Sequence, residues 1–239
     1  MPFVSDFAPR QFSDLILPDQ SIAAKLRQYS TLGCNDHLLL FGPAGTAKTT
    51  VAELLQELRD LHSNVVPQKL VIEGTDWDAS SINAIDNLWS FQRTNGVKVP
   101  TFVINEVDEL TMRQQNELRA FLSKRLGKLC VMMTTNNIGK LREPLKDRCT
   151  RIHMPKITLP DWLPRVQQYL TQNQLILPDP AVLKVIKTSN GSVRDLGRAV
   201  DDLIFAQRSK APKSVVPRVA KSTISTKGRG LNTIAGNSV

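Results

Sequence analysis

One eight-residue segment constrains the fold of this chain more than any other. Gly42-Pro43-Ala44-Gly45-Thr46-Ala47-Lys48-Thr49 directly follows a short apolar run, His37 to Phe41, and opens an amphipathic stretch, Lys48 to Leu61. It is close to the pattern G-x-x-x-x-G-K-[ST], in which backbone N–H groups and a helix N-terminus hold phosphates. The lysine reaches the terminal phosphates and the hydroxyl meets Mg²⁺. The strand-to-helix context therefore predicts a phosphate-binding site.

The residues expected to contact the nucleotide form one continuous run: Gly42, Pro43, Ala44, Gly45, Thr46, Ala47, Lys48, Thr49 and Thr50. One position departs from the pattern, because Ala47 stands where the last glycine is usual. Alanine adopts helical dihedral angles without strain. The substitution is therefore acceptable if Ala47 lies in the first turn of the helix.

Short apolar runs alternate with amphipathic segments along the first two thirds of the chain. This alternation is typical of an α/β fold in which helices cross between the strands of a parallel sheet. The predicted strands are His37–Phe41, Lys69–Ile72, Thr101–Asn105, Leu129–Thr135 and Thr150–His153. The predicted helices between them are Lys48–Leu61, Ser81–Phe91 and Met112–Leu126.

After residue 153 the strand pattern stops. Pro155, Pro160 and Pro164 mark a boundary, and three helices are expected beyond it, at Trp162–Gln172, Asp179–Thr188 and Ser192–Arg208. We predict a large domain over residues 1–155, a small helical lid domain over 156–207, and a disordered basic tail over 208–239.

The positive charge of the chain is concentrated in that tail. The net charge is +9, and seven Lys and Arg residues without any acid follow residue 207, so the body is nearly neutral.

With 41% hydrophobic and 22% charged residues, the composition indicates a globular body. No apolar run approaches the ~18 residues of a membrane helix, and the start MPFVSDFAPR lacks the order of a signal peptide. We expect no membrane contact and a cytoplasmic location, or the host cytoplasm if the chain is viral.

A second group of polar residues follows the apolar run Thr101 to Ile104. Asn105 and Glu106 come at the carboxyl end of this strand, where parallel α/β sheets place their ligands. A nucleotide hydrolase needs one acid there for hydrated Mg²⁺ and another to activate water. Glu106 fits the second role, whereas the first falls on Asn105, a neutral amide. We expect slow turnover. Asn105→Asp should raise the catalytic rate, unless Asp108 already supplies the carboxylate that positions the metal.

These residues resemble the AAA+ ATPases, and among them the clamp-loader subunits, namely the replication factor C small subunits and their tailed-phage counterparts. The likeness extends from about Phe7 to Leu203. The segments that carry it besides the loop and the acidic strand end are Phe7-Ala8-Pro9-Arg10 with Asp14-Leu15-Ile16, Thr134 to Ile138, Glu143 to Cys149, and Gly191-Ser192-Val193-Arg194. The ordered succession of these motifs is more specific than any one of them.

The resemblance implies roles for three further residues, with ATP and Mg as cofactors. Asn136 would be sensor 1, and it ends a strand expected beside the acidic one. Arg148 would be the arginine finger that completes the site of a neighbouring AAA+ subunit. Arg194 would be sensor 2, and it lies at a helix start, where a cation opposes the helix dipole unless an anion binds. Asp147 stands in place of the family's serine, and a carboxylate at this position could pair with Arg148 and hold it back.

The resemblance also implies DNA as a partner, and a sliding clamp as a further one. In clamp loaders the helices after the second strand and after the acidic strand line the inner face of a ring. Their starts here offer Ser80, Ser81, Thr111 and Arg113, which suit phosphate contacts. Ordinary helix capping explains the same residues equally well.

Two alternatives stay open beside a clamp-loader-like ATPase. Only the basic tail follows the predicted lid, whereas clamp-loader subunits of this class continue into a helical collar. The first alternative is a helicase-loader, transposition or repair ATPase. The second is a weakly hydrolysing, nucleotide-bound assembly subunit, suggested by Asn105 and Asp147.

Overall fold

The computed structural model describes residues 9–17, 19–63, 70–189 and 192–210. Five parallel strands form one sheet in the order β2-β3-β4-β1-β5. The strands are β1 His37–Phe41, β2 Val71–Glu73, β3 Thr101–Asn105, β4 Cys130–Thr135 and β5 Cys149–His153. The predicted parallel α/β sheet is therefore confirmed, with each strand within two residues of its expected start.

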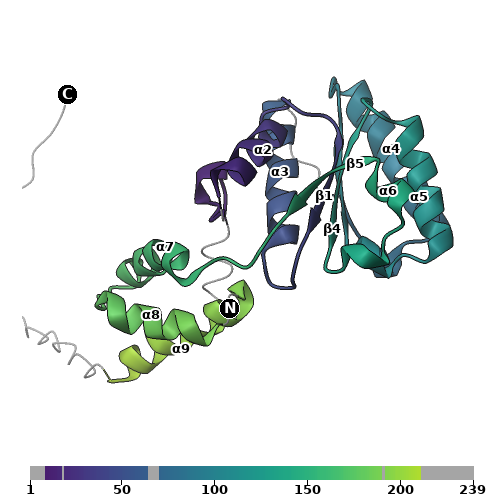
Figure 1. Ribbon diagram of the computed structural model, residues 1–239. Helices are drawn as coiled ribbons and strands as arrows, with labels where there is room; N and C mark the ends of the chain where they lie inside the picture. Colours follow the sequence, from purple (N-terminus) through teal and green to yellow (C-terminus); the bar gives the residue numbers. More distant parts are fainter. Residues whose placement is uncertain (1–8, 18, 64–69, 190–191, 211–239) are drawn as a thin grey trace, which may run out of the picture.

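Helices cover both faces of this sheet (Figure 1). One face carries α2 and α3, and the other carries α4, α5 and the short α6. Their bounds are α2 Gln20–Ser30, α3 Lys48–His62, α4 Ala79–Thr94, α5 Met112–Lys124 and α6 Glu143–Lys146. Single 3-10 turns add η1 Phe12–Asp14, η2 Gly74–Asp76, η3 Val107–Glu109 and η4 Ile138–Lys140. Sequence reasoning missed α2, the helix that precedes the first strand.

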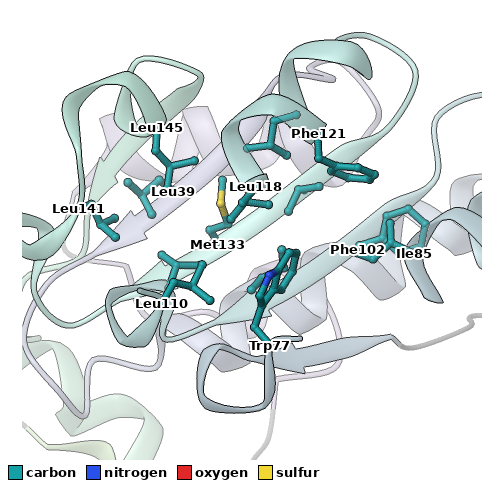
Figure 2. Packing of buried hydrophobic residues seen from close by; sticks show 14 of the residues in the cluster. Leu39, Trp77, Ile85, Phe102, Leu110, Leu118, Phe121, Met133, Leu141 and Leu145 are labelled. Carbon is teal, nitrogen blue, oxygen red and sulfur yellow. The ribbon is translucent and has the colours of Figure 1, made fainter. Parts of the chain in front are cut away.

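Alternation along the strands divides the apolar core into two layers. Leu38 and Leu40 of β1 face α2 and α3, whereas Leu39 faces the opposite side. There it joins residues of α4 and α5 such as Ile85 and Phe121, which pack over the sheet in Figure 2. Burial of these side chains drives the sheet and its helices together.

The helical pattern predicts most inward positions of α3 and α5 correctly. Leu118, Phe121 and Leu122 are buried as expected. Leu61 also falls on the inward side of the pattern, but it is exposed, because Arg59 and Asp60 are the residues that the last turn of α3 buries. Leu126 is exposed as well, since α5 ends at Lys124.

The last three helices, α7 Leu159–Gln172, α8 Asp179–Thr188 and α9 Val193–Lys210, have an apolar core of their own. In Figure 1 they lie beside the sheet rather than on either of its faces. Residues 208–210, the start of the predicted tail, belong to α9, and the rest of that tail lies outside the described residues. None of the helices in the described part combines the length and apolar character that crossing a bilayer requires.

Candidate nucleotide-binding site

The loop between β1 and α3 depends on two glycines. Gly42 has φ +152° and Gly45 has φ +80°, and a Cβ at Gly42 would lie 2.2 Å from the Met154 carbonyl oxygen. Any side chain at position 42 would push β1 away from the segment that follows β5. The close approach holds the loop against the sheet, so its position is set by glycine at both turns.

Ala47 is not in the first helical turn, so the condition for a strain-free alanine is not met. It is the residue before α3 and has φ 61° and ψ 23°, in the left-handed region. This conformation costs an L-residue with a Cβ roughly 1–2 kcal/mol. The loop therefore holds a strained alanine where the usual glycine would be relaxed.

Replacing Ala47 with glycine should raise the free energy of unfolding by about 0.5 to 1 kcal/mol, because relief of the left-handed strain exceeds the extra chain entropy of glycine. Urea unfolding followed by circular dichroism measures the change. Ala52→Gly in the interior of α3 is the matched control and should destabilise by about 0.5–1 kcal/mol. If Ala47→Gly lowered the free energy of unfolding, the inference that Ala47 is strained would be wrong.

Lys48 is held inside the loop that it follows. Its side chain is buried, with 6% of the residue exposed. The ammonium Nζ donates hydrogen bonds to the carbonyl oxygens of Gly42 (2.9 Å) and Pro43 (2.8 Å). Burial lowers the pKa of Lys48, while the carboxylates of Asp108 and Glu106 act in the opposite direction. The loop thus carries a partly desolvated cation facing the acidic end of β3.

Glu106 and Asn136 lie at the ends of neighbouring strands, as predicted, and their side chains are in contact. The exposed Glu106 follows β3 with φ 52°, and its Oε1 accepts from Asn136 Nδ2 at 3.4 Å. The backbone N–H of Asn136 donates to Asp108 Oδ1 at 3.3 Å. Strand β4 lies between β1 and β3, so Asn136 at its end is bracketed by both acids of the neighbouring turn.

Asn105 is buried, with only 2% of the residue exposed, and both ends of its amide are bonded within the protein. Nδ2 donates to Glu73 Oε1 at 3.0 Å, and Oδ1 accepts from Thr134 Oγ1 at 3.2 Å. Thr134 Oγ1 in turn accepts the backbone N–H of Glu106 at 3.1 Å. Sequence reasoning missed Glu73 and gave Thr134 no role of its own, because both act through neighbouring strands rather than through a motif.

Two adjoining cavities open at this end of the sheet. The polar one, of about 260 Å³, is lined by the loop and by residues of three other segments: Ala44 to Thr50, Glu106, Thr134, Asn136, Val193 and Arg194. The other, of about 270 Å³, is mainly apolar and is lined by residues that include Leu15, Ile16, Val51, Met154, Ile157 and Trp162. Thr46, Ala47, Thr50 and Val193 belong to both, so a polar and an apolar compartment share one wall.

The start of α9 reaches this wall directly. Val193 at the start of α9 donates its N–H to the Gly45 carbonyl oxygen at 3.1 Å, and a Cβ on Gly45 would lie 3.0 Å from Ser192 Oγ. Arg194 is exposed and lines the polar cavity, as expected for a sensor. Gly191, which begins the same motif, lies outside the described residues, as do Phe7 and Ala8.

The family comparison agrees with this geometry. Residues 38–156 match the model described as "ATPase family associated with various cellular activities (AAA)". The chain carries an AAA ATPase domain. The match spans all five strands, from the start of β1 to just beyond β5.

Curated relatives of this AAA chain are replication factor C subunits. Human replication factor C subunit 5 is 25% identical over 198 residues, covering 81% of this chain and 57% of the human protein. Replication factor C small subunit 2 of Pyrobaculum aerophilum is 27% identical over 233 residues, covering 91% of this chain and 70% of the relative. The chain thus spans less than three fifths of the length of the human subunit.

Among solved structures, the Thermotoga maritima RuvB Holliday junction branch migration motor has a TM-score of 0.64 at 17% identity, covering 84% of this chain and 67% of that one. A point mutant of the same protein has a TM-score of 0.67 at 18% identity, covering 85% of this chain and 68% of the mutant. At these identities the likeness establishes the P-loop AAA+ fold alone.

The remaining predicted site residues lie away from the cavities. Arg148 is exposed in the turn between α6 and β5 and is not among the cavity residues. In the described part of the chain no ion pair joins it to Asp147. Asp147 therefore does not hold Arg148 back in this structure, and the guanidinium of Arg148 is exposed.

The four DNA candidates lie at the starts of α4 and α5. The hydroxyls of Ser80 and Ser81 donate to Asp78 Oδ1, and so do their backbone N–H groups. Thr111 caps α5 by accepting from the Gln114 N–H. Arg113 is 90% exposed and pairs with Glu117 at 3.0 Å. The capping carboxylate of Asp78 occupies the groups that would meet phosphate on α4, which leaves Arg113 as the strongest candidate.

Proposed function

We propose that this chain binds ATP with Mg²⁺ and hydrolyses it, and that it works as a clamp-loader-like ATPase on DNA. The observation that supports this best is the convergence of Lys48, Glu106, Asn136 and Arg194 from four separate segments on one polar cavity. An apolar compartment of matching size adjoins it. A nucleotide needs both surroundings, a polar one for its phosphates and an apolar one for its base.

The donor set at the polar cavity fits Mg²⁺. The Thr49 hydroxyl and the Glu106 carboxylate line the cavity, whereas Asn105 is buried and is not among the lining residues. The oxygens of all three are hard ligands, the kind that Mg²⁺ takes directly or through water. When bound, Mg²⁺ neutralises charge on the β- and γ-phosphate oxygens. Because Asn105 Oδ1 already accepts the Thr134 hydroxyl, we assign its contact to metal-bound water rather than to the ion itself.

The hydrolytic step follows from the remaining residues. The N–H groups of the loop and the Lys48 ammonium bind the phosphates, and Glu106 takes a proton from the attacking water. Asn136 holds Glu106 and the water in place through its amide. Arg194 from the lid, and Arg148 of a neighbouring subunit, stabilise charge on the transferred phosphoryl group. The products are ADP and phosphate.

Direct titration with ATP tests the binding step, and phosphate release tests hydrolysis. Intrinsic fluorescence suits the titration, because Trp162 lines the apolar compartment. No ATP affinity in the wild-type chain would overturn the proposal as a whole. Turnover with and without primed DNA and a sliding clamp separates clamp loading from helicase-loader, transposition or repair activity. Binding without turnover under all conditions would favour the assembly subunit.

The active form should be an oligomer, because Arg148 lies outside its own cavity and acts only from a neighbour. Neither Arg148→Ala nor Lys48→Ala should hydrolyse ATP alone, but a mixture should regain part of the activity. In the mixture some sites pair an intact Lys48 with an intact Arg148. Phosphate release across mixing ratios measures this, and full activity from a dilute, verified monomer would contradict it.

DNA stimulation should depend on Arg113 more than on the tail. Arg113→Ala should lower DNA-stimulated turnover, whereas Lys124→Ala, at the other end of the exposed face of α5, should not. Deleting residues 211–239 should instead flatten the salt dependence of DNA binding, because fewer counterions are released. The cut falls after Lys210 so that α9 stays whole. Loss of stimulation on tail deletion alone would make the tail the DNA-binding element.

A further inference from the structure

A chain of hydrogen bonds crosses three strands at the acidic end of the sheet. Glu73 Oε1 accepts from Asn105 Nδ2 (3.0 Å), Asn105 Oδ1 accepts from Thr134 Oγ1 (3.2 Å), and Thr134 Oγ1 accepts from the Glu106 N–H (3.1 Å). The first two bonds join β2 to β3 and β3 to β4, and the third returns from β4 to the residue that follows β3. The chain starts at an exposed carboxylate on β2 and ends at the backbone of Glu106.

We infer that Glu73 is a positioning residue for hydrolysis, and that it carries the negative charge which position 105 lacks. The inference rests on the proposed ATPase function. The position before Glu106 is usually an acid in hydrolases of this kind, and here it is an amide. The neighbouring strand places a carboxylate in register with that amide, since Glu73 pairs with Asn105 in the β2–β3 ladder.

The charge on Glu73 fixes which way the Asn105 amide points. A flipped amide would set Oδ1 against the carboxylate, two acceptors facing each other, so only the observed orientation is satisfied. In that orientation Oδ1 accepts the hydrogen bond that the Thr134 hydroxyl donates. The lone pairs of this hydroxyl are then left for the Glu106 N–H. The hydrogen bond from an amide to a carboxylate is charge-assisted, and it makes Oδ1 a better acceptor.

The backbone also couples Glu73 to Glu106. Gly74 follows Glu73, and a Cβ on Gly74 would lie 2.3 Å from the Glu106 carbonyl oxygen and 3.1 Å from that of Asn105. The two strand ends therefore touch directly. Glu106 lies in the left-handed region at φ 52°, a conformation that persists only where its surroundings hold it. The contact with Gly74 and the bond from Thr134 both do so.

Glu73 changes what a restored aspartate should do. With Glu73 present, Asn105→Asp sets two carboxylates about one hydrogen-bond length apart, so one must take up a proton or turn away. Asn105→Asp alone should therefore give no gain in kcat, contrary to the expectation from the sequence. In a Glu73→Gln background the new carboxylate accepts from the glutamine amide, and the negative charge has moved across the same hydrogen bond.

A four-variant cycle tests this: wild type, Glu73→Gln, Asn105→Asp and the double variant. Glu73→Gln should lower kcat about five- to tenfold with KM for ATP nearly unchanged, because the charge-assisted bond becomes a neutral one. The double variant should recover wild-type kcat or exceed it. Asp76→Asn, an exposed acid three residues along on η2, is the matched control and should change nothing.

A second readout does not require turnover. The side-chain NH₂ resonances of Asn105, assigned by their absence in Asn105→Asp, should shift in Glu73→Gln, which replaces the carboxylate that Nδ2 contacts, and keep their position in Asp76→Asn. The half-saturating Mn²⁺ concentration for ADP binding should rise in Glu73→Gln and return in the double variant. Melting temperatures show that each variant is folded.

The two proposals fail in different ways. If wild type hydrolyses no ATP, the proposed function falls while the resonance shift still tests the pairing of Glu73 with Asn105. If wild type hydrolyses ATP but Asn105→Asp raises kcat equally in the wild-type and the Glu73→Gln backgrounds, the two positions are independent and the inference is overturned. It is also overturned if Glu73→Gln leaves kcat and the Mn²⁺ dependence unchanged.

Discussion

Lys48→Ala will lower kcat/KM for ATP by roughly 100-fold or more, because it removes the cation that faces the terminal phosphates in a desolvated pocket. The wild-type ammonium is already buried and bonded to two loop carbonyls. A phosphate therefore needs little reorganisation to gain it as a partner. Phosphate release measures the loss of turnover, and ATP titration measures the loss of ATP affinity.

Alanine at this position also removes buried packing, so Lys48→Met serves as a second variant. It keeps most of the side chain's apolar length and removes only the charge. The two variants should be equally inactive if the charge is what matters. Lys25→Ala, at an exposed lysine on α2, is the control. An active, folded Lys48→Met would show that the phosphates bind elsewhere.

Glu106→Gln will lower kcat by a factor of about 10² to 10⁴, the range that a general base contributes, and it will leave ATP bound. The glutamine keeps the size of the side chain and its contact with Asn136, but it cannot take a proton from water. ATP should then accumulate on the protein and hold it in the nucleotide-bound assembly.

Single-turnover hydrolysis and retention of labelled ATP on a desalting column measure these two effects. Glu109→Gln is the control, since Glu109 is an exposed acid of the same turn that pairs with Lys140. A Glu106→Gln variant that turns over normally would assign the base to Asp108, which lies two residues away and is largely buried. A variant that loses ATP binding altogether would show that the Glu106 charge is needed to hold Mg²⁺ and the nucleotide, and not only to activate water.

The sequence by itself determined the local features of this protein. Apolar runs flanked by polar turns mark the three inner strands β1, β3 and β4, because a strand buried on both faces needs an unbroken apolar stretch. The loop motif and Glu106 are also local, since spacing along the chain sets their chemistry. The helical periodicity of α3 and α5 predicts buried positions such as Leu55 and Leu118, and it fails at Leu61, because the last turn of α3 buries the polar Arg59 and Asp60 instead.

The tertiary structure decided what depends on neighbours in space. The strand order places β4 between β1 and β3 and so brings Asn136 to Glu106. Loop closure against Met154 sets the path of the loop that ends in a left-handed Ala47, which no propensity of alanine foretells. The pairing of Glu73 with Asn105 joins residues 32 positions apart in the chain. Such a pair has no local signature, because register between strands is set by packing of the whole sheet. The sequence shows that residue 105 is an asparagine, but only the contact with Glu73 fixes which way its amide points.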